Sequence, residues 1–238
     1  MTMTVREALE AGQFYSAFQP LVDLKSRRTF GFESLVRSTS PDFPSAFSVI
    51  EAAVGQGMMG ELGRALRRDA VNRCPNYPLF INLHPIEFDQ GWLIRPDDAT
   101  ALHTHEVYLE ITESVPLTHF RHCHSVLREM RAKGLKLAVD DLGAGYSNLK
   151  YISDLSPEVV KLDRMLISNL ASDERLKVLV SAIVQLCIKL GARVVAEGIE
   201  TRDELRACME AGAHYGQGFY LGKPHRDPLP VAFSVLEV

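Results

Sequence analysis

Acidic and amide side chains recur at the ends of short apolar segments in this chain of 238 residues. The apolar segment 135–139 runs into two adjacent aspartates, and the segment 192–196 runs into a glutamate. Charged side chains are rarely buried unless they are paired or bind a metal. Any one of these residues alone is explained as well by a helix N-cap or a salt bridge, but together they predict a cation site. In chain order they are Glu33, Asn82, Glu110, Asp140, Asp141, Lys161, Glu197 and Gln217.

This set of side chains predicts a particular chemistry. Carboxylates held close together repel one another, and their pKa values rise unless cations neutralise them. Oxygen ligands without a usable set of cysteines or histidines suit Mg²⁺ or Mn²⁺. The adjacent Asp140 and Asp141 suit two metals that share a ligand. Two such cations imply displacement at a phosphate ester by an activated water molecule.

Repeated helix–strand units must position these residues. Three times a helical run ends at a glycine and a short apolar strand follows, at Gly134, Gly191 and Gly212. Such units imply a parallel sheet, whose strand ends converge on one face. Strands are predicted at 15–23, 29–37, 79–83, 107–111, 136–139 and 159–162, and helices at 45–56, 60–74, 120–133, 149–155, 173–190 and 201–211.

The order of these elements predicts the fold class. About eight strands alternate with helices, as in a TIM-type barrel, and no linker rich in Pro, Gly or Ser divides them. We therefore expect one α/β domain over residues 1–238, a TIM-type (β/α)8 barrel, with a doubly wound open sheet as the structural alternative. The segments 96–104 and 225–238 are predicted to be loop or tail.

Composition and charge limit the class of protein. Apolar residues make up 46% and charged residues 24%, which is ordinary for a soluble globular protein. The net charge of −4, with both signs spread along the chain, argues against a nucleic-acid polymer as partner but not against a small phosphodiester. No apolar run approaches the ~20 residues of a membrane span, and no signal core begins the chain. We therefore expect a cytoplasmic protein without direct membrane insertion.

Cysteines and histidines give no second site. The four cysteines contain no Cys-x-x-Cys pair and are predicted to be buried, reduced thiols. Among His119, His122, Cys123 and His124, a helix would place His119 on one face with His122 or with Cys123, but no carboxylate or cysteine pair stands at zinc spacing. An exposed helix start is the expected structure there.

Several ordered motifs resemble those of one known family. The segment Gly-Phe-Glu33-Ser-Leu35-Val-Arg37 resembles the Glu-Ala-Leu signature of the EAL family of bacterial cyclic di-GMP phosphodiesterases and their inactive relatives. The resemblance extends over residues 13–224. The other matching motifs begin at Glu110, Asp140, Lys161, Ala196 and Gln217.

The resemblance implies a fold, an activity and partners. The fold is a TIM-type barrel with one antiparallel strand. The activity is hydrolysis of cyclic di-GMP to linear pGpG, with two Mg²⁺ or Mn²⁺ ions per site. The alternative is a catalytically weak receptor that binds cyclic di-GMP. A homodimer is expected, and a longer native protein would carry fused sensory or GGDEF domains.

The resemblance also implies a role for each matching residue. Asp140 is shared between the two metals, Lys161 lies beside the attacking water and the scissile phosphate, and Glu197 is the general base as well as a ligand. The metal ligands are Glu33, Asn82, Glu110, Asp140, Asp141 and Glu197. The substrate contacts are Gln19, Leu35, Arg37 and Gln217, and the loop-bracing residues are Glu113 and Glu200.

Four residues depart from the common pattern of the family. Ser34 adds a hydroxyl where alanine is common. His84 stands two residues after Asn82, where it either hydrogen-bonds near the metal ligands or packs on a proline. Leu142 and Ala144 lie in the loop that connects the dimer interface with the site in relatives. These departures bear on regulation more than on the chemistry.

Overall fold

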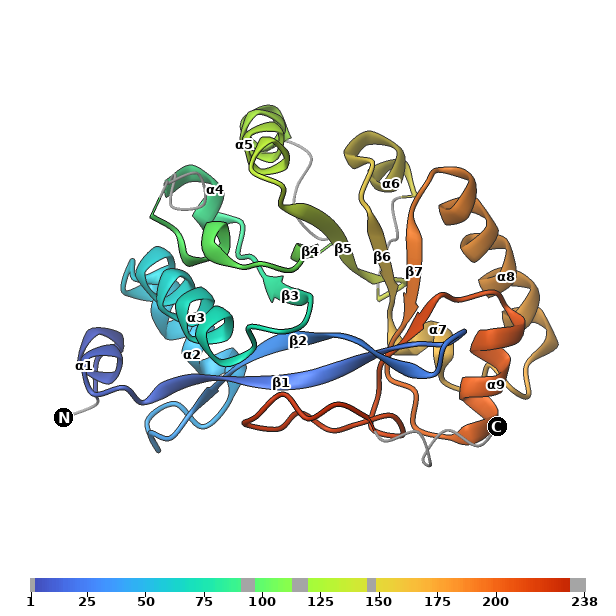
Figure 1. Cartoon of the computed structure of the whole chain (residues 1–238), viewed down its shortest axis with the longest axis horizontal. Helices are drawn as coiled ribbons and strands as arrows, with labels where there is room; N and C mark the ends of the chain where they lie inside the picture. The colour runs from blue at the N-terminus through green and yellow to red at the C-terminus, as the bar shows by residue number, and fades with distance from the viewer. Residues whose placement is uncertain (1–2, 91–96, 113–119, 145–148, 232–238) are drawn as a thin grey trace.

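Eight strands close into a barrel in chain order (Figure 1). The structure, a computed structural model, describes residues 3–90, 97–112, 120–144 and 149–231. β1 runs antiparallel to both of its neighbours, β2 and β8, and the remaining pairs are parallel. The predicted barrel with one antiparallel strand is confirmed, and the open sheet is excluded. The strands are β1 (Phe14–Asp23), β2 (Arg28–Ser38), β3 (Leu79–Asn82), β4 (Val107–Thr112), β5 (Lys136–Leu142), β6 (Val159–Leu162), β7 (Arg193–Ala196) and β8 (Tyr215–Gly216).

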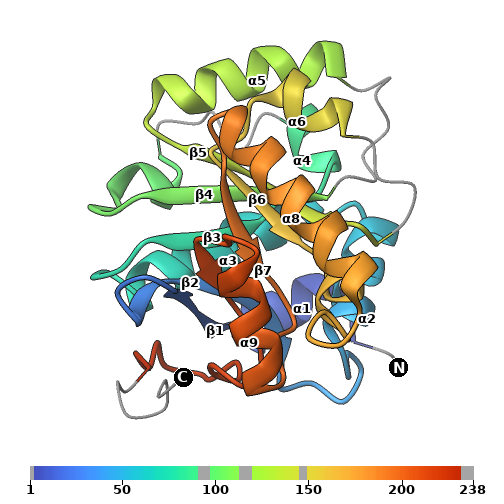
Figure 2. The same cartoon turned by 90° about the vertical axis from the view of Figure 1, so that its right-hand side faces the viewer.

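Helices cover most of the outside of the barrel, and the coil after β8 runs along β1 (Figures 1 and 2). The predicted helix signals are confirmed: Thr201 forms a capping box with Glu204, and Gly134, Gly191 and Gly212 have φ angles of 82°, 87° and 89°. The helices are α1 (Val5–Glu10), α2 (Ala46–Gly55), α3 (Met59–Arg73), α4 (Ile86–Gln90), η2 (Ala99–Leu102), α5 (Phe120–Ala132), α6 (Lys150–Leu155), α7 (Arg164–Ile167), α8 (Glu174–Lys189) and α9 (Arg202–Glu210).

The prediction of loop over 96–104 is wrong at its centre, where η2 forms a short 3-10 helix. The side chain of Asp98 accepts hydrogen bonds from the backbone N–H of Thr100, at 3.1 Å, and from its hydroxyl, at 2.7 Å. This cap stabilises a turn that is too short to give an apolar period. The short helices α4 and α7 went unpredicted for the same reason.

The lower part of the barrel interior is apolar. One inward-facing residue from most strands contributes to it, and Phe30 stacks on Tyr215 with ring centroids 4.4 Å apart. This layer closes the barrel below the site. Its buried members are Leu21, Phe80, Tyr108, Ala138, Val159, Val195 and Tyr215.

Four cysteines were predicted to be buried, reduced thiols. The three that the structure describes, Cys74, Cys187 and Cys208, are buried and unpaired, which confirms the prediction for them. Burial raises the pKa of the Cys74 and Cys208 thiols to about 12 and that of Cys187 to about 11. The prediction for Cys123 concerns a side chain outside the described part of the structure. Within the described ranges, no helix combines the length and apolar character that crossing a bilayer requires.

Candidate active site

The polar side chains of the site lie one pleat above the apolar layer. In a strand, residues i and i+2 face the same side. On β3 to β8 each buried apolar residue is therefore followed, two positions later, by an inward-facing polar residue. The pairs are Phe80 with Asn82, Tyr108 with Glu110, Ala138 with Asp140, Val159 with Lys161, Val195 with Glu197 and Tyr215 with Gln217.

Lys161 is the centre of this polar layer. Its side chain is 1% exposed, and its Nζ lies 2.7 Å from Glu110 Oε1 and 2.8 Å from Glu197 Oε1. The same nitrogen lies 3.1 Å from Asp140 Oδ1 and 3.3 Å from Glu33 Oε2. Four strands and the end of a fifth thus bring one cation and four carboxylates together, as the sequence predicts.

Two amides complete the surroundings of Glu33. Asn82 Nδ2 donates to Glu33 Oε1 at 2.9 Å, and Gln217 Nε2 donates to Glu33 Oε2 at 2.6 Å. Burial alone would raise the pKa of Glu33, but Lys161 and the two amide hydrogen bonds lower it below the usual range. Glu33 is therefore held as a carboxylate.

Three carboxylates of the site, those of Glu110, Glu197 and Asp141, hold their protons more tightly than usual. Burial, together with the charge of Glu33, raises the pKa of Glu110 well above its usual value. Burial likewise raises the pKa of Glu197, although Lys161 opposes this effect. Burial and the neighbouring Asp140 raise the pKa of Asp141 to about 6. Burial would lower the pKa of Lys161, but its four carboxylate partners raise it well above the usual range.

This donor set fits divalent cations. Two groups of carboxylates have oxygens within 4.8 Å of one another: Glu33, Glu110 and Asp140 form one, and Asp140, Asp141 and Glu197 form the other. Asp140 belongs to both. Glu110 Oε2 is buried without a hydrogen-bond partner among the described residues. One lysine cannot neutralise all of these carboxylates, so hard cations with oxygen ligands would complete the site.

A local irregularity brings the two adjacent aspartates together. Neighbouring residues of a regular strand point to opposite faces. The pairing of β5 with β6 is irregular between Val139 and Leu142, and Asp141 has a φ angle of 60°. Aspartate tolerates this left-handed conformation better than most residues. Asp141 can therefore join the group formed with Asp140.

Two cavities of similar size flank Glu33, which lines both. The first, here called the β2–α3 cavity, has a volume of about 270 Å³ and is mostly apolar. The second, the β7–β8 cavity, has a volume of about 240 Å³. The β2–α3 cavity is lined among others by Ser34, Leu35, Arg37, Met59, Gly63 and Asn82, and the β7–β8 cavity by Gln19, Asp163, Arg164, Glu200, Gln217 and Phe219.

The predicted substrate residues are divided between these cavities. Leu35 and Arg37 line the first, whereas Gln19 and Gln217 line the second. Glu200 also lines the second cavity, where Arg164 Nη2 lies 2.8 Å from its Oε2. The loop-bracing role of Glu113 and the environment of His119 concern residues outside the described ranges.

Three further features of this region were not predicted. His84 Nδ1 accepts the backbone N–H of Ile86 at 3.3 Å, so this ring contributes to the local turn. Arg164 and Phe219 line the β7–β8 cavity. Arg67 is a basic residue among the buried residues of α3, and its burial was not predicted. The apolar period of this helix contained the signal, because Arg67 stands where the period expects an apolar residue.

A model of the EAL domain family matches residues 3–224. The cyclic di-GMP phosphodiesterase PA2567 of Pseudomonas aeruginosa is 33% identical over 224 residues, covering 89% of this chain and 38% of the relative. The solved PaMucR phosphodiesterase with c-di-GMP superposes with a TM-score of 0.82 at 29% identity, covering 93% of this chain and 95% of that chain.

A second solved structure contains a metal. It is Klebsiella pneumoniae BlrP1 with manganese and cyclic di-GMP, with a TM-score of 0.80 at 28% identity, covering 92% of this chain and 58% of that chain. This chain spans between 28% and 55% of the length of the curated relatives compared with it. Because the family model covers all the strands of the barrel and the polar layer above it, this chain belongs to the EAL domain family.

Proposed function

We infer that this domain hydrolyses cyclic di-GMP to linear pGpG with the help of two divalent cations. The observation that carries this inference is the place of Glu33. Glu33 belongs to the first carboxylate group, which has Asp140 in common with the second group. Glu33 also lines both cavities. A phosphodiester bound across Glu33 would have one nucleoside half on each side, which suits a cyclic dinucleotide. The relatives named for this substrate support the same choice.

The residues of the polar layer suit hydrolysis of a phosphodiester. Glu33, Asn82, Glu110 and Asp140 would hold one cation, and Asp140, Asp141 and Glu197 the other. When bound, the cations would polarise the phosphate and lower the pKa of the attacking water. Glu197, which lies beside Lys161 at the edge of the layer, would accept the proton from that water. Lys161, which its partners keep charged, would stabilise the negative charge that develops at phosphorus.

The cavities give the remaining predicted residues their roles. Leu35 would contact a base in the mostly apolar β2–α3 cavity, and Arg37 would contact a phosphate nearby. Gln19 and Gln217 would contact the other half of the substrate in the β7–β8 cavity. The pair of Arg164 and Glu200 would hold the loop after β7 in place.

The direct test is product analysis. Purified protein with Mn²⁺ and cyclic di-GMP is expected to yield pGpG, detected by anion-exchange chromatography. Binding is measured in parallel by isothermal titration calorimetry with Ca²⁺. Binding without any product would replace the enzyme with the receptor alternative. Neither binding nor product would refute both assignments.

The metal preference gives a separate prediction. Mn²⁺ or Mg²⁺ is expected to support hydrolysis, whereas Ca²⁺ is expected to support binding without turnover. Ca²⁺ is larger, prefers more ligands at longer distances, and polarises water less. Initial rates at saturating concentrations of each ion test this expectation. Equal rates with Ca²⁺ and Mg²⁺ would contradict water activation by small hard cations.

We also infer that the domain forms a homodimer through the segment 142–148 and α6, and that the dimer favours metal binding. Gly143, near the start of this segment, has a φ angle of 108°, which only glycine adopts without strain. Specific activity is expected to rise with protein concentration across the monomer–dimer transition, and less so in Glu113→Ala. Activity and sedimentation velocity are measured over the same range. Constant specific activity across the transition would show that assembly does not control the site.

A further inference from the structure

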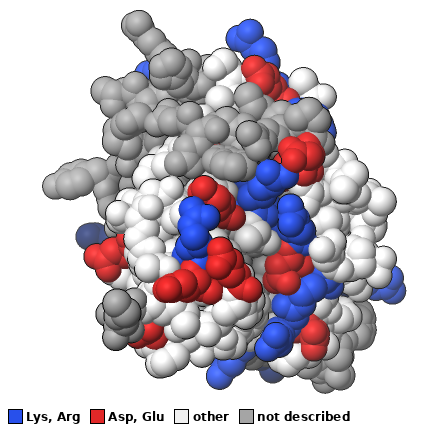
Figure 3. Space-filling model, turned by 90° about the vertical axis from the view of Figure 1, so that its left-hand side faces the viewer, with Lys and Arg blue, Asp and Glu red and all other residues white. Residues whose placement is uncertain are grey.

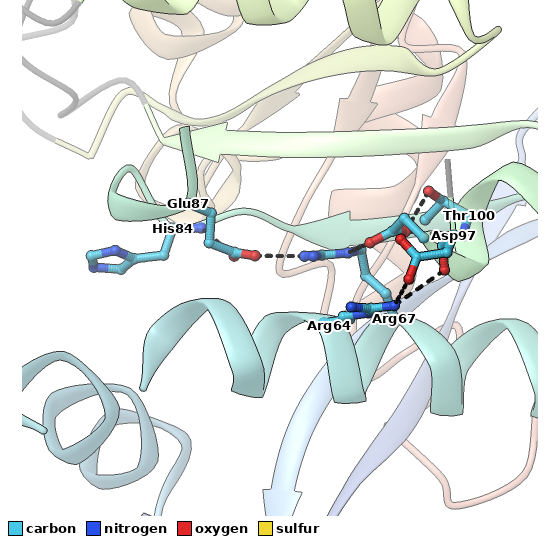
Figure 4. Close-up of polar contacts among 7 residues, drawn as sticks. Arg64, Arg67, His84, Glu87, Asp97 and Thr100 are labelled. Atoms are coloured by element: carbon cyan, nitrogen blue, oxygen red, sulfur yellow. Dashed lines mark hydrogen bonds and ion pairs between the residues drawn. The ribbon is translucent and has the colours of Figure 1, made fainter. Parts of the chain in front are cut away.

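Three charged side chains are buried together beside the turn that follows β3 (Figure 4). Arg67 on α3, Glu87 on α4 and Asp98 before η2 are 1%, 0% and 2% exposed. Arg67 Nη1 lies 2.6 Å from Glu87 Oε2, and Arg67 Nε lies 3.0 Å from Asp98 Oδ2. We call these three residues the Arg67 cluster.

Fold stability alone does not account for the Arg67 cluster. Desolvation of buried ions offsets much of their attraction, and well-packed apolar residues of similar size often stabilise a fold equally well. Arg67 Nη2 is also buried without a hydrogen-bond partner among the described residues, so the cluster is not fully satisfied. Arg67 takes a position on the buried stripe of α3 that an apolar residue would ordinarily occupy.

The cluster is connected to the candidate active site by hydrogen bonds. Glu87 Oε1 accepts the backbone N–H of His84 at 3.3 Å, and the N–H of Glu87 donates to His84 O at 2.9 Å. The N–H of Leu83 donates to Glu110 O at 2.9 Å. The turn directly after Asn82 is therefore held on one side by the Arg67 cluster and on the other by β4.

The same carboxylate packs against the wall of a cavity. A Cβ atom added at Gly63 would lie 2.3 Å from Glu87 Oε2, so the glycine permits this close approach. Gly63 itself lines the β2–α3 cavity. Glu87 thus contacts both α3, which forms the cavity wall, and the turn that follows β3. Figure 4 shows its carboxylate directed toward Arg67, with the His84 ring on the opposite side.

We propose that Arg67, Glu87 and Asp98 are positioning residues that fix the turn after β3 against α3 and thereby hold Asn82 at Glu33. Asn82 Nδ2 donates to Glu33 Oε1 at 2.9 Å, and the turn held by Glu87 begins directly after Asn82. The proposal rests on the proposed function, because it takes Glu33 and Asn82 as ligands of a divalent cation. Residues that orient metal ligands typically change metal affinity by about 10- to 100-fold when they are replaced.

A partly exposed ion pair that begins on the same helix provides the control. Arg64 lies one turn before Arg67 on α3 and pairs with Asp97, and their side chains are 21% and 63% exposed. Acidic and basic side chains are interleaved over this side of the molecule (Figure 3). Such surface pairs contribute little to stability. Arg64→Gln should therefore leave the turn after β3 undisturbed.

The test compares two cluster variants. The triple variant Arg67→Met, Glu87→Met, Asp98→Asn replaces the ions with side chains of similar size and removes the acceptor for His84 N–H. It is expected to raise the Kd for Mn²⁺ alone about tenfold or more, measured by electron paramagnetic resonance without nucleotide. Glu87→Gln keeps one acceptor oxygen, and its Kd is expected to lie between those of the wild type and the triple variant. Hydrolysis should show a lower kcat at saturating Mn²⁺ with a smaller change in KM.

Two controls separate positioning from stability. Arg64→Gln is expected to keep the wild-type Kd for Mn²⁺. Val184→Ala, on the buried face of α8, is expected to lower Tm without changing that Kd. If the triple variant folds and binds Mn²⁺ as the wild type does, the proposal is wrong and the Arg67 cluster serves the fold alone. If the triple variant does not fold, an unchanged Kd in Glu87→Gln overturns the proposal.

The failure of the proposed function has a different signature. Wild-type protein that binds no Mn²⁺ would refute the metal site and the positioning role together. Wild-type protein that binds Mn²⁺ normally, with both cluster variants unchanged, would refute the positioning role alone.

Discussion

Asp140→Ala is expected to abolish hydrolysis of cyclic di-GMP, a loss of at least about a thousandfold. Asp140 is the residue shared by the two carboxylate groups, so its removal takes a ligand from both proposed cations at once. Several kcal/mol of charge stabilisation in the transition state would disappear, and each 1.4 kcal/mol is about tenfold in rate. Initial rates with Mn²⁺, together with the number of Mn²⁺ ions bound, measure the effect.

The control for this change is a carboxylate at the other end of the barrel. Glu106 pairs with Lys136 just before β4 and accepts a hydrogen bond from Tyr108 at 3.0 Å. Glu106→Gln is expected to leave kcat and the number of bound Mn²⁺ ions unchanged. Far-UV circular dichroism should show the same fold for both variants. Substantial turnover by folded Asp140→Ala protein would contradict the assignment of Asp140 as the shared ligand.

Glu197→Gln is expected to lower kcat by about 10²- to 10⁴-fold, the usual contribution of a general base. KM should change much less, because a base acts mainly in the transition state. Glutamine has the same size as glutamate, and the Glu197 side chain is 17% exposed at the edge of the polar layer, so the fold should persist. Steady-state kinetics with saturating Mn²⁺, and Kd for cyclic di-GMP with Ca²⁺, separate these effects.

A control variant and the count of bound Mn²⁺ ions test whether Glu197 is the general base. Glu174→Gln breaks an exposed pair with Lys177 on α8 and is expected to change neither kcat nor KM. A Glu197→Gln variant that keeps most of its kcat would show that another group accepts the proton. A variant that instead loses one bound Mn²⁺ ion would show that Glu197 acts chiefly as a ligand.

The polar layer could be located from the sequence because strands alternate with a fixed period. Six residues of the site follow a buried apolar residue by two positions, as Glu110 follows Tyr108 and Lys161 follows Val159. Local helix signals were equally direct, since Gly134 and Thr201 act on neighbouring backbone atoms. These features depend on interactions within a few residues, and the sequence contains them in full.

Other features depend on residues far apart in the chain. The left-handed conformation of Asp141 follows from the irregular pairing of β5 with β6, which no local pattern announces. The β7–β8 cavity combines Gln19 from the first strand with Phe219 after the last. η2 is too short to show an apolar period, so the sequence did not predict this helix.

The sequence by itself determined the helix–strand units, the residues of the polar layer and the kind of cation that suits them, because strand period and donor type are properties of short segments. It favoured a barrel over an open sheet, and the closed pairing of the strands decided between the two. Tertiary structure decided which charges meet. Lys161 contacts four carboxylates only because the closed barrel brings their strands to one axis. Arg67 and Glu87, 20 residues apart, meet only because α3 and α4 pack together, and their burial makes that contact specific.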